Sequence, residues 1–110
     1  MNIKKNDILL VDFPFSNLKE KKVRLALVLK SLEGRNNILC QITTKKQLLE
    51  DYLIFLPKSS CDGDIRFDSY INLDMIFSLN QSLIKGKIGF IKDTKVINEI
   101  NTKLKSMFFD

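Results

Sequence analysis

Short apolar runs separated by polar segments make up most of this chain. The first run, residues 7–15, has apolar side chains on both faces of an extended strand, and the later runs are rich in β-branched residues and leucine. Between the first two runs lies the polar, charged segment 16–23, which is long enough to form a functional loop. Six or seven short strands are predicted, over residues 7–15, 23–30, 37–42, 52–57, 68–73, 74–79 and 86–91.

The period of the apolar positions changes at the C-terminal end. In residues 93–109 they recur at helical spacing after an Asp93 or Thr94 cap, which predicts an amphipathic helix. Residues 44–51 have helix-forming composition and predict one short helical turn, with Thr43 or Thr44 as its N-cap. The predicted fold is therefore mainly β with a C-terminal helix (α+β), a small antiparallel barrel on which the helix packs.

Composition sets limits on the protein class. The chain has 110 residues, 45% of them hydrophobic, and residues 1–110 are expected to form a single domain. The net charge of +5 permits a polyanionic partner without requiring one. No apolar stretch approaches a membrane span and the N-terminus lacks a signal-peptide pattern, so we expect a cytoplasmic protein with no membrane contact. Cys40 in a strand and Cys61 in a loop, without C-x-x-C or histidine, favour free thiols over a disulfide or zinc site.

The candidate functional residues lie where the second predicted strand begins and where the third ends. Arg24, one of three arginines beside fifteen lysines, leads directly into an apolar run, and Thr43 and Thr44 end the next one. Lysine pairs flank both places: Lys21 with Lys22, and Lys45 with Lys46. By residue type alone these are most often a solvated arginine, strand-end or cap threonines, and solubilising lysines. The chain has no histidine and no ligand cluster with metal spacing, so neither a metal nor a cofactor is expected.

Three segments together, 7–29, 38–45 and 68–89, resemble the MazF/PemK toxins of bacterial toxin–antitoxin pairs, in the family's order and over most of the chain. In that family a long loop joins the first two strands, the second strand opens with Arg-Pro and an apolar run, and the third ends in Ile-Thr. Arg24 and Thr43 stand at the arginine and threonine positions, and Leu25 stands where the family usually has proline.

The resemblance implies a homodimeric SH3-like barrel that cuts single-stranded RNA, including mRNA, at specific short sequences without a metal. It also implies a cognate antitoxin as partner. In that chemistry the RNA 2′-hydroxyl attacks the adjacent phosphorus and leaves 2′,3′-cyclic phosphate and 5′-hydroxyl ends. Arg24 and Thr43 are then the expected catalytic groups, which stabilise charge on the phosphate and hold it in place. The expected RNA contacts are Lys21, Lys22, Thr44, Lys45 and Lys46, with no general base assigned.

Two other classes of function remain open at this stage. A CcdB-like toxin shares the barrel but acts by binding gyrase, and the matches at Arg24 and Thr43 argue against it. A non-catalytic RNA-binding barrel is favoured only by Leu25 and by the unassigned base. Assays with single-stranded RNA, and then with gyrase and DNA, separate all three.

Overall fold

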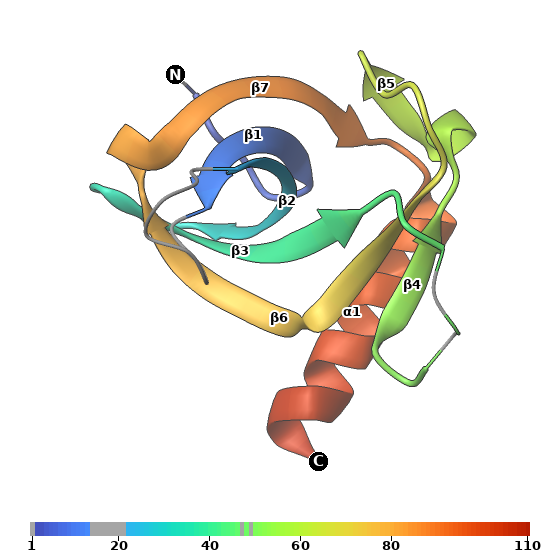
Figure 1. The fold of residues 1–110 in the computed structure, drawn as a ribbon. Coiled ribbons are helices and arrows are strands. Elements are labelled where there is room, and N and C mark those ends of the chain that lie inside the picture. The colour runs from blue at the N-terminus through green and yellow to red at the C-terminus, as the bar shows by residue number, and fades with distance from the viewer. Residues whose placement is uncertain (1, 14–21, 47, 49) are drawn as a thin grey trace.

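The computed structural model describes residues 2–13, 22–46, 48 and 50–110, with the side chain of Lys22 left undescribed. These described residues form seven strands, two short 3₁₀ helices (η1 and η2) and one α-helix (Figure 1). The strands are β1 Asp7–Phe13, β2 Lys22–Ser31, β3 Asn36–Thr43, β4 Leu53–Leu56, β5 Cys61–Gly63, β6 Ser69–Asn80 and β7 Ile84–Ile91. The helices are η1 Lys58–Ser60, η2 Gln81–Leu83 and α1 Thr94–Phe109.

All seven strands belong to one antiparallel sheet in the order β4-β6-β3-β2-β1-β7-β5. The sheet coils strongly, so that β7 arches over β1 and β2 while β3 and β6 run on their other side (Figure 1). In the described part of the chain the edge strands β4 and β5 do not pair with each other. The predicted mainly β architecture is confirmed, as a barrel-like sheet that stays open between these two edges.

Coiling buries both faces of the central strands. Alternate residues of β2 point to opposite sides: Leu27 belongs to one core cluster, and Ala26 and Val28 belong to the other. The first cluster lies between the sheet and α1, and the second fills the inside of the coiled sheet together with Phe13 and Leu39. This explains why the first strand is apolar at successive positions rather than alternating.

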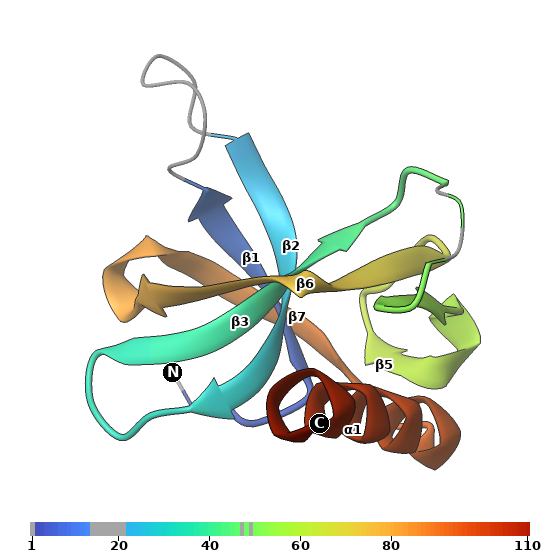
Figure 2. The same ribbon diagram turned by 90° about the horizontal axis from the view of Figure 1, so that it is seen from below.

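The C-terminal helix was correctly predicted. The side chain of Asp93 caps it by accepting a hydrogen bond from the Lys95 N–H (2.9 Å). Val96 and Ile100 are buried in the first core cluster, so α1 covers one side of the sheet, as Figure 2 shows from below. No helix in the described ranges is both long and apolar enough to cross a membrane.

The predicted helical turn over 44–51 is wrong for the residues that the structure describes there. The Thr43 hydroxyl accepts a hydrogen bond from the Lys45 N–H (3.2 Å), but the described residues that follow are not helical, and Asp51 and Tyr52 form a turn before β4. A local side-chain bond of this kind competes with helix formation. Helix propensity over so few residues is too weak to form a helix without packing.

Two other boundaries differ from the prediction. The runs 68–73 and 74–79 form one strand, β6, interrupted by an irregularity rather than a turn. The segment 58–67, between the predicted strands 52–57 and 68–73, contains η1 and the short strand β5, which pairs with β7. Cys61 is a free thiol, as predicted, but it lies buried in β5 rather than in a loop, and burial raises the pKa of its thiol to about 11.

Two backbones approach each other closely where β5 meets β7. Gly63, with φ +104°, pairs with Gly89, and a Cβ atom on Gly89 would collide with the carbonyl oxygen of Asp62. Gly86, on the same strand, has open space where a Cβ would stand. The glycine at 89 is thus required by close packing of two strands rather than by its own φ angle.

We expect Gly89→Ala to lower the free energy of unfolding by about 1–3 kcal/mol, because neither backbone can give way without disturbing the β5–β7 ladder. Gly86→Ala is the matched control and should stay within about 0.5 kcal/mol of the wild type, or exceed it. Urea unfolding followed by circular dichroism measures both. Equal stabilities for the two variants would contradict the close approach.

Candidate functional site

Arg24 stands near the start of β2, where the strand emerges from the core. It pairs with Val11 of β1, and its side chain is exposed to solvent. The guanidinium forms no hydrogen bond or ion pair with another residue of the described part of the chain. An exposed, permanently charged fork of donors at a fixed backbone position is suited to binding a phosphate.

The pairing of β2 with β3 brings Thr43 next to Arg24. Leu25 is opposite Ile42, and the next position in the same register places Arg24 opposite Thr43, on the same face of the sheet. Thr43 Oγ1 accepts the Lys45 N–H, which leaves its O–H free to donate to a ligand. Two residues that were singled out from separate segments thus become lateral neighbours.

In the family that the sequence resembles, a proline at the position of Leu25 restricts the backbone next to the arginine. In this chain Leu25 holds the backbone by a different means. It pairs with Leu10 of β1 and Ile42 of β3, and its side chain packs against the first core cluster. Strand pairing on both sides and a packed side chain fix the direction of the neighbouring Arg24 without a proline ring.

The other expected RNA contacts divide into three groups. Lys45 and Lys46 come shortly after Thr43, with Thr44 between, and are exposed. Thr44 lines a pocket of about 230 Å³ with Leu25 and other residues, on the side of the sheet away from Thr43. Lys21 lies outside the described residues, as does Glu20, and the side chain of Lys22 is not described.

A row of side chains continues from this pair across two more strands. Thr43 pairs with Tyr70 of β6, and Tyr70 pairs with Phe55 of β4. The rings of Tyr70 and Phe55 lie 5.5 Å apart between centroids with a tilt of 51°, and Phe55 is 43% exposed. We call Arg24, Thr43, Tyr70 and Phe55 the cross-strand row. Both aromatic residues lie in apolar runs, so their exposure could not be recognised before the register was known.

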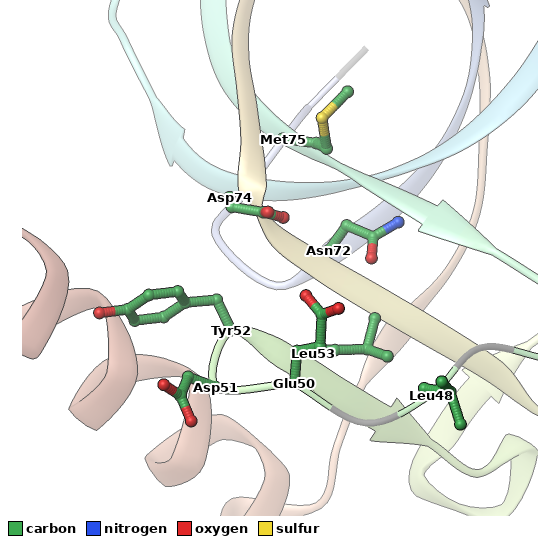
Figure 3. A pocket seen from close by; sticks show the side chains of 8 residues that line it. All are labelled: Leu48, Glu50, Asp51, Tyr52, Leu53, Asn72, Asp74 and Met75. Atoms are coloured by element: carbon green, nitrogen blue, oxygen red, sulfur yellow. The ribbon is translucent and has the colours of Figure 1, made fainter.

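The next pair of residues along the same face is also polar. Gln41 pairs with Asn72, and the Asn72 side-chain N–H donates to the side-chain amide oxygen (Oε1) of Gln41 (3.2 Å). Beyond them lies a pocket of about 850 Å³ that opens between β6 and the approach to β4 (Figure 3). Among the described residues its lining includes three carboxylates and no basic side chain: Leu48, Glu50, Asp51, Tyr52, Leu53, Asn72, Asp74 and Met75.

Other polar and aromatic residues near these strands have structural roles. Asp12 forms an ion pair with Lys85 (3.2 Å), and Asp68 accepts a hydrogen bond from the Lys58 N–H (2.9 Å). Phe13 is buried and packs edge-on against Phe77, with ring centroids 4.6 Å apart. The described residues contain no group of three or more His, Cys, Asp or Glu side chains placed to hold a metal ion.

The fold is similar to that of several solved toxins. An endoribonuclease in complex with its cognate antitoxin from a mycobacterial species has a TM-score of 0.72 at 14% identity, covering 96% of this chain and 93% of that one. The Mycobacterium tuberculosis toxin MazF-mt6 has a TM-score of 0.71 at 14% identity, covering 93% and 95%. MazF from Deinococcus radiodurans has a TM-score of 0.70 at 18% identity, covering 96% and 94%.

A search of curated protein sequences finds no match. The family model of the PemK-like, MazF-like toxins of type II toxin–antitoxin systems matches residues 4–108, nearly the whole chain. This match spans the strands that carry Arg24 and Thr43 as well as the C-terminal helix. The chain therefore belongs to the family of PemK-like, MazF-like toxins of type II toxin–antitoxin systems.

Proposed function

We propose that this toxin is an endoribonuclease that cleaves single-stranded RNA, including mRNA in the cytoplasm, at short specific sequences. The observation that carries the proposal is the register placing Arg24 opposite Thr43 at the exposed end of the sheet. Two structural neighbours are described as endoribonucleases, which supports the same activity. We propose further that residues 1–110 act as a single toxin domain.

The proposed reaction uses the nucleophile that RNA carries. The O2′ atom attacks the adjacent phosphorus as its proton leaves, the P–O5′ bond breaks, and O5′ takes up a proton. The products carry a 2′,3′-cyclic phosphate and a 5′-hydroxyl. Arg24 stabilises the charge that develops on the phosphoryl oxygens, and the Thr43 O–H donates to one of them. No step in this scheme requires a metal-activated water.

Basic residues beside the pair extend the proposed phosphate contact. Lys45 and Lys46 come shortly after Thr43 and attract the RNA backbone, and Lys21 and Lys22 are proposed for the same role. Thr44, on the far side of the sheet, is proposed to contact a neighbouring part of the RNA. The three carboxylates of the larger pocket repel phosphate, so the backbone is expected to run along the lysine side of the row.

Two protein partners complete the proposal. Family membership makes a cognate antitoxin the natural protein partner, and one neighbour is solved in complex with its own antitoxin. A second copy of the chain is proposed to cover the apolar groove of about 510 Å³ beside the end of α1, where Phe108 and Phe109 are 63% and 83% exposed. Large exposed aromatic side chains in such a groove are typical of an interface.

Arg24→Ala is expected to fold normally and to lose roughly 100-fold or more in RNA cleavage, as the loss of one charge-stabilising donor does. Arg24→Lys should also be impaired, because a point charge does not reproduce the planar fork. Arg35→Ala, at the exposed turn between β2 and β3, is the matched control and should cleave normally. Wild-type cleavage by Arg24→Ala would remove Arg24 from the mechanism.

A second experiment tests the nucleophile. An RNA with deoxyribose on the 5′ side of the scissile phosphate should still bind but should not be cut, in buffer containing EDTA. The products of the normal RNA should accept label from polynucleotide kinase without phosphatase treatment. Cleavage of the deoxy strand, or products with 5′-phosphates, would mean hydrolysis by water. Gyrase inhibition without any RNA cleavage would support the CcdB-like alternative instead.

The dimer is tested by Phe109→Lys and Phe108→Lys, which place a charge in the groove that the second copy is proposed to bury. Both variants should sediment as monomers at concentrations where the wild type is dimeric, because an unpaired buried charge is costly. Phe67→Lys, at another strongly exposed phenylalanine, should leave the dimer intact. A monomeric wild type, or dimers in all three variants, would contradict the assignment.

A further inference from the structure

The two rings of the cross-strand row have no role in the chemistry described so far. Their neighbours along each strand point into the first core cluster: Ile71 beside Tyr70, and Ile54 and Leu56 beside Phe55. Tyr70 and Phe55 therefore lie on the face of the sheet opposite this cluster, level with Thr43, where Tyr70 is half-buried and Phe55 is exposed. An aromatic pair at that level is placed to touch whatever Arg24 and Thr43 hold.

We propose that Tyr70 and Phe55 form a stacking platform for a nucleobase of the RNA, next to the phosphate that Arg24 and Thr43 bind. The proposal rests on the proposed function and names the groups that hold the nucleotide beside the cleavage point. The two halves of the row then have different roles, because the β2–β3 half binds the phosphate and the β6–β4 half binds the base.

The spacing of the strands fits this division. Adjacent strands are about 5 Å apart, so Tyr70 lies one strand from Thr43 and two from Arg24. A base attached to the held phosphate is within reach of the Tyr70 ring, and the Phe55 ring, 5.5 Å from that of Tyr70, extends the aromatic surface away from the charged end. Proteins that bind single strands commonly combine a basic backbone track with aromatic faces in this way.

The polarity on either side of the row agrees with the same path. Lys45 and Lys46 lie beyond Thr43 on one side, while Glu50 and Asp74 line the pocket beyond Asn72 on the other. Phosphates are attracted to the first side and repelled from the second. A neutral base, unlike a phosphate, is not repelled by these carboxylates, so the aromatic half of the row can bind a base beside the acidic pocket.

A purely structural role for the rings is the competing explanation, because aromatic cross-strand pairs also stabilise sheets. Substitution by leucine separates the two roles, since leucine keeps apolar area in the sheet but has no flat π-face. We expect Tyr70→Leu and Phe55→Leu each to weaken binding of a random-sequence, 2′-fluoro single-stranded RNA by at least about 5-fold. Tyr70→Phe and Phe55→Tyr keep a ring and should bind like the wild type.

Phe90→Leu is the matched control. Phe90 is 40% exposed, close to the 43% of Phe55, and also lies on a strand, but on β7 at the opposite end of the sheet. Its replacement should leave RNA affinity unchanged. Thermal unfolding of all variants shows whether a loss of binding accompanies a loss of fold; weakened binding only in variants that unfold at the assay temperature would support the structural role and overturn the platform.

Tyrosine fluorescence gives a direct readout, because the chain has no tryptophan and only two tyrosines, Tyr52 and Tyr70. In Tyr52→Phe the emission comes from Tyr70 alone, and addition of the 2′-fluoro RNA should quench it. In Tyr70→Phe the emission comes from Tyr52, in the acidic pocket, and should change little. Because the RNA absorbs the same amount of exciting light in both samples, each variant serves as a control for this loss of emission in the other. Quenching of Tyr52 but not Tyr70 would place the base in the pocket and overturn the platform.

The outcomes separate this inference from the proposed function. Cleavage by the wild type that depends on Arg24, with normal binding by the leucine variants and unquenched Tyr70, overturns the platform alone. RNA binding that depends on the two rings, without any cleavage, supports the platform and overturns the nuclease. Absence of RNA binding by the wild type overturns both.

Discussion

The antiparallel register that joins β2, β3 and β6 is the constraint on which the rest of this structure depends. Side chains opposite one another in such a ladder share a face, so one choice of register decides at once what is buried and what is presented. Here it places Leu27 with Cys40 in the core and Arg24 level with Thr43 outside it. A slip of one residue would bury the guanidinium and expose the apolar set.

The same ladder fixes the backbones of the two residues that we propose bind the phosphate, Arg24 and Thr43. Arg24 and Thr43 come from the ends of strands whose inner halves are fully buried, so their backbones are fixed by the core rather than by a loop. Hydrogen-bond donors that are already held in place stabilise a charged transition state more than donors that must first be ordered. Leu25 contributes to this by packing, which is a substitute for the rigidity that a proline ring gives.

The sequence was sufficient for most of the fold and for half of the row. Apolar runs located five strands and α1 closely, and Arg24 and Thr43 were singled out because they border two of these runs and match positions of the family that the sequence resembles. Local pattern failed where tertiary contacts decide: residues 44–51 have helical composition but no face to pack, and β5 forms only because Gly63 and Gly89 let two backbones meet. Tyr70 and Phe55 were missed because an aromatic residue in an apolar run has the same pattern whether it points inward or outward.

The irregularity in β6 shows where a protein of this fold can change in length or charge without disturbing its core. Opposite the adjacent residues Cys40 and Gln41 of β3, β6 has Ile76 and Asn72, so that three of its residues, Leu73 to Met75, are spanned by one step of the partner strand. Leu73 stays buried while Asp74 and Met75 are displaced to the rim of the larger pocket. Pairing resumes on both sides, so this short segment separates a fixed ladder from a surface that is free to change. Changes of length or charge there can remodel the surface beside the row while the core ladder keeps its alignment.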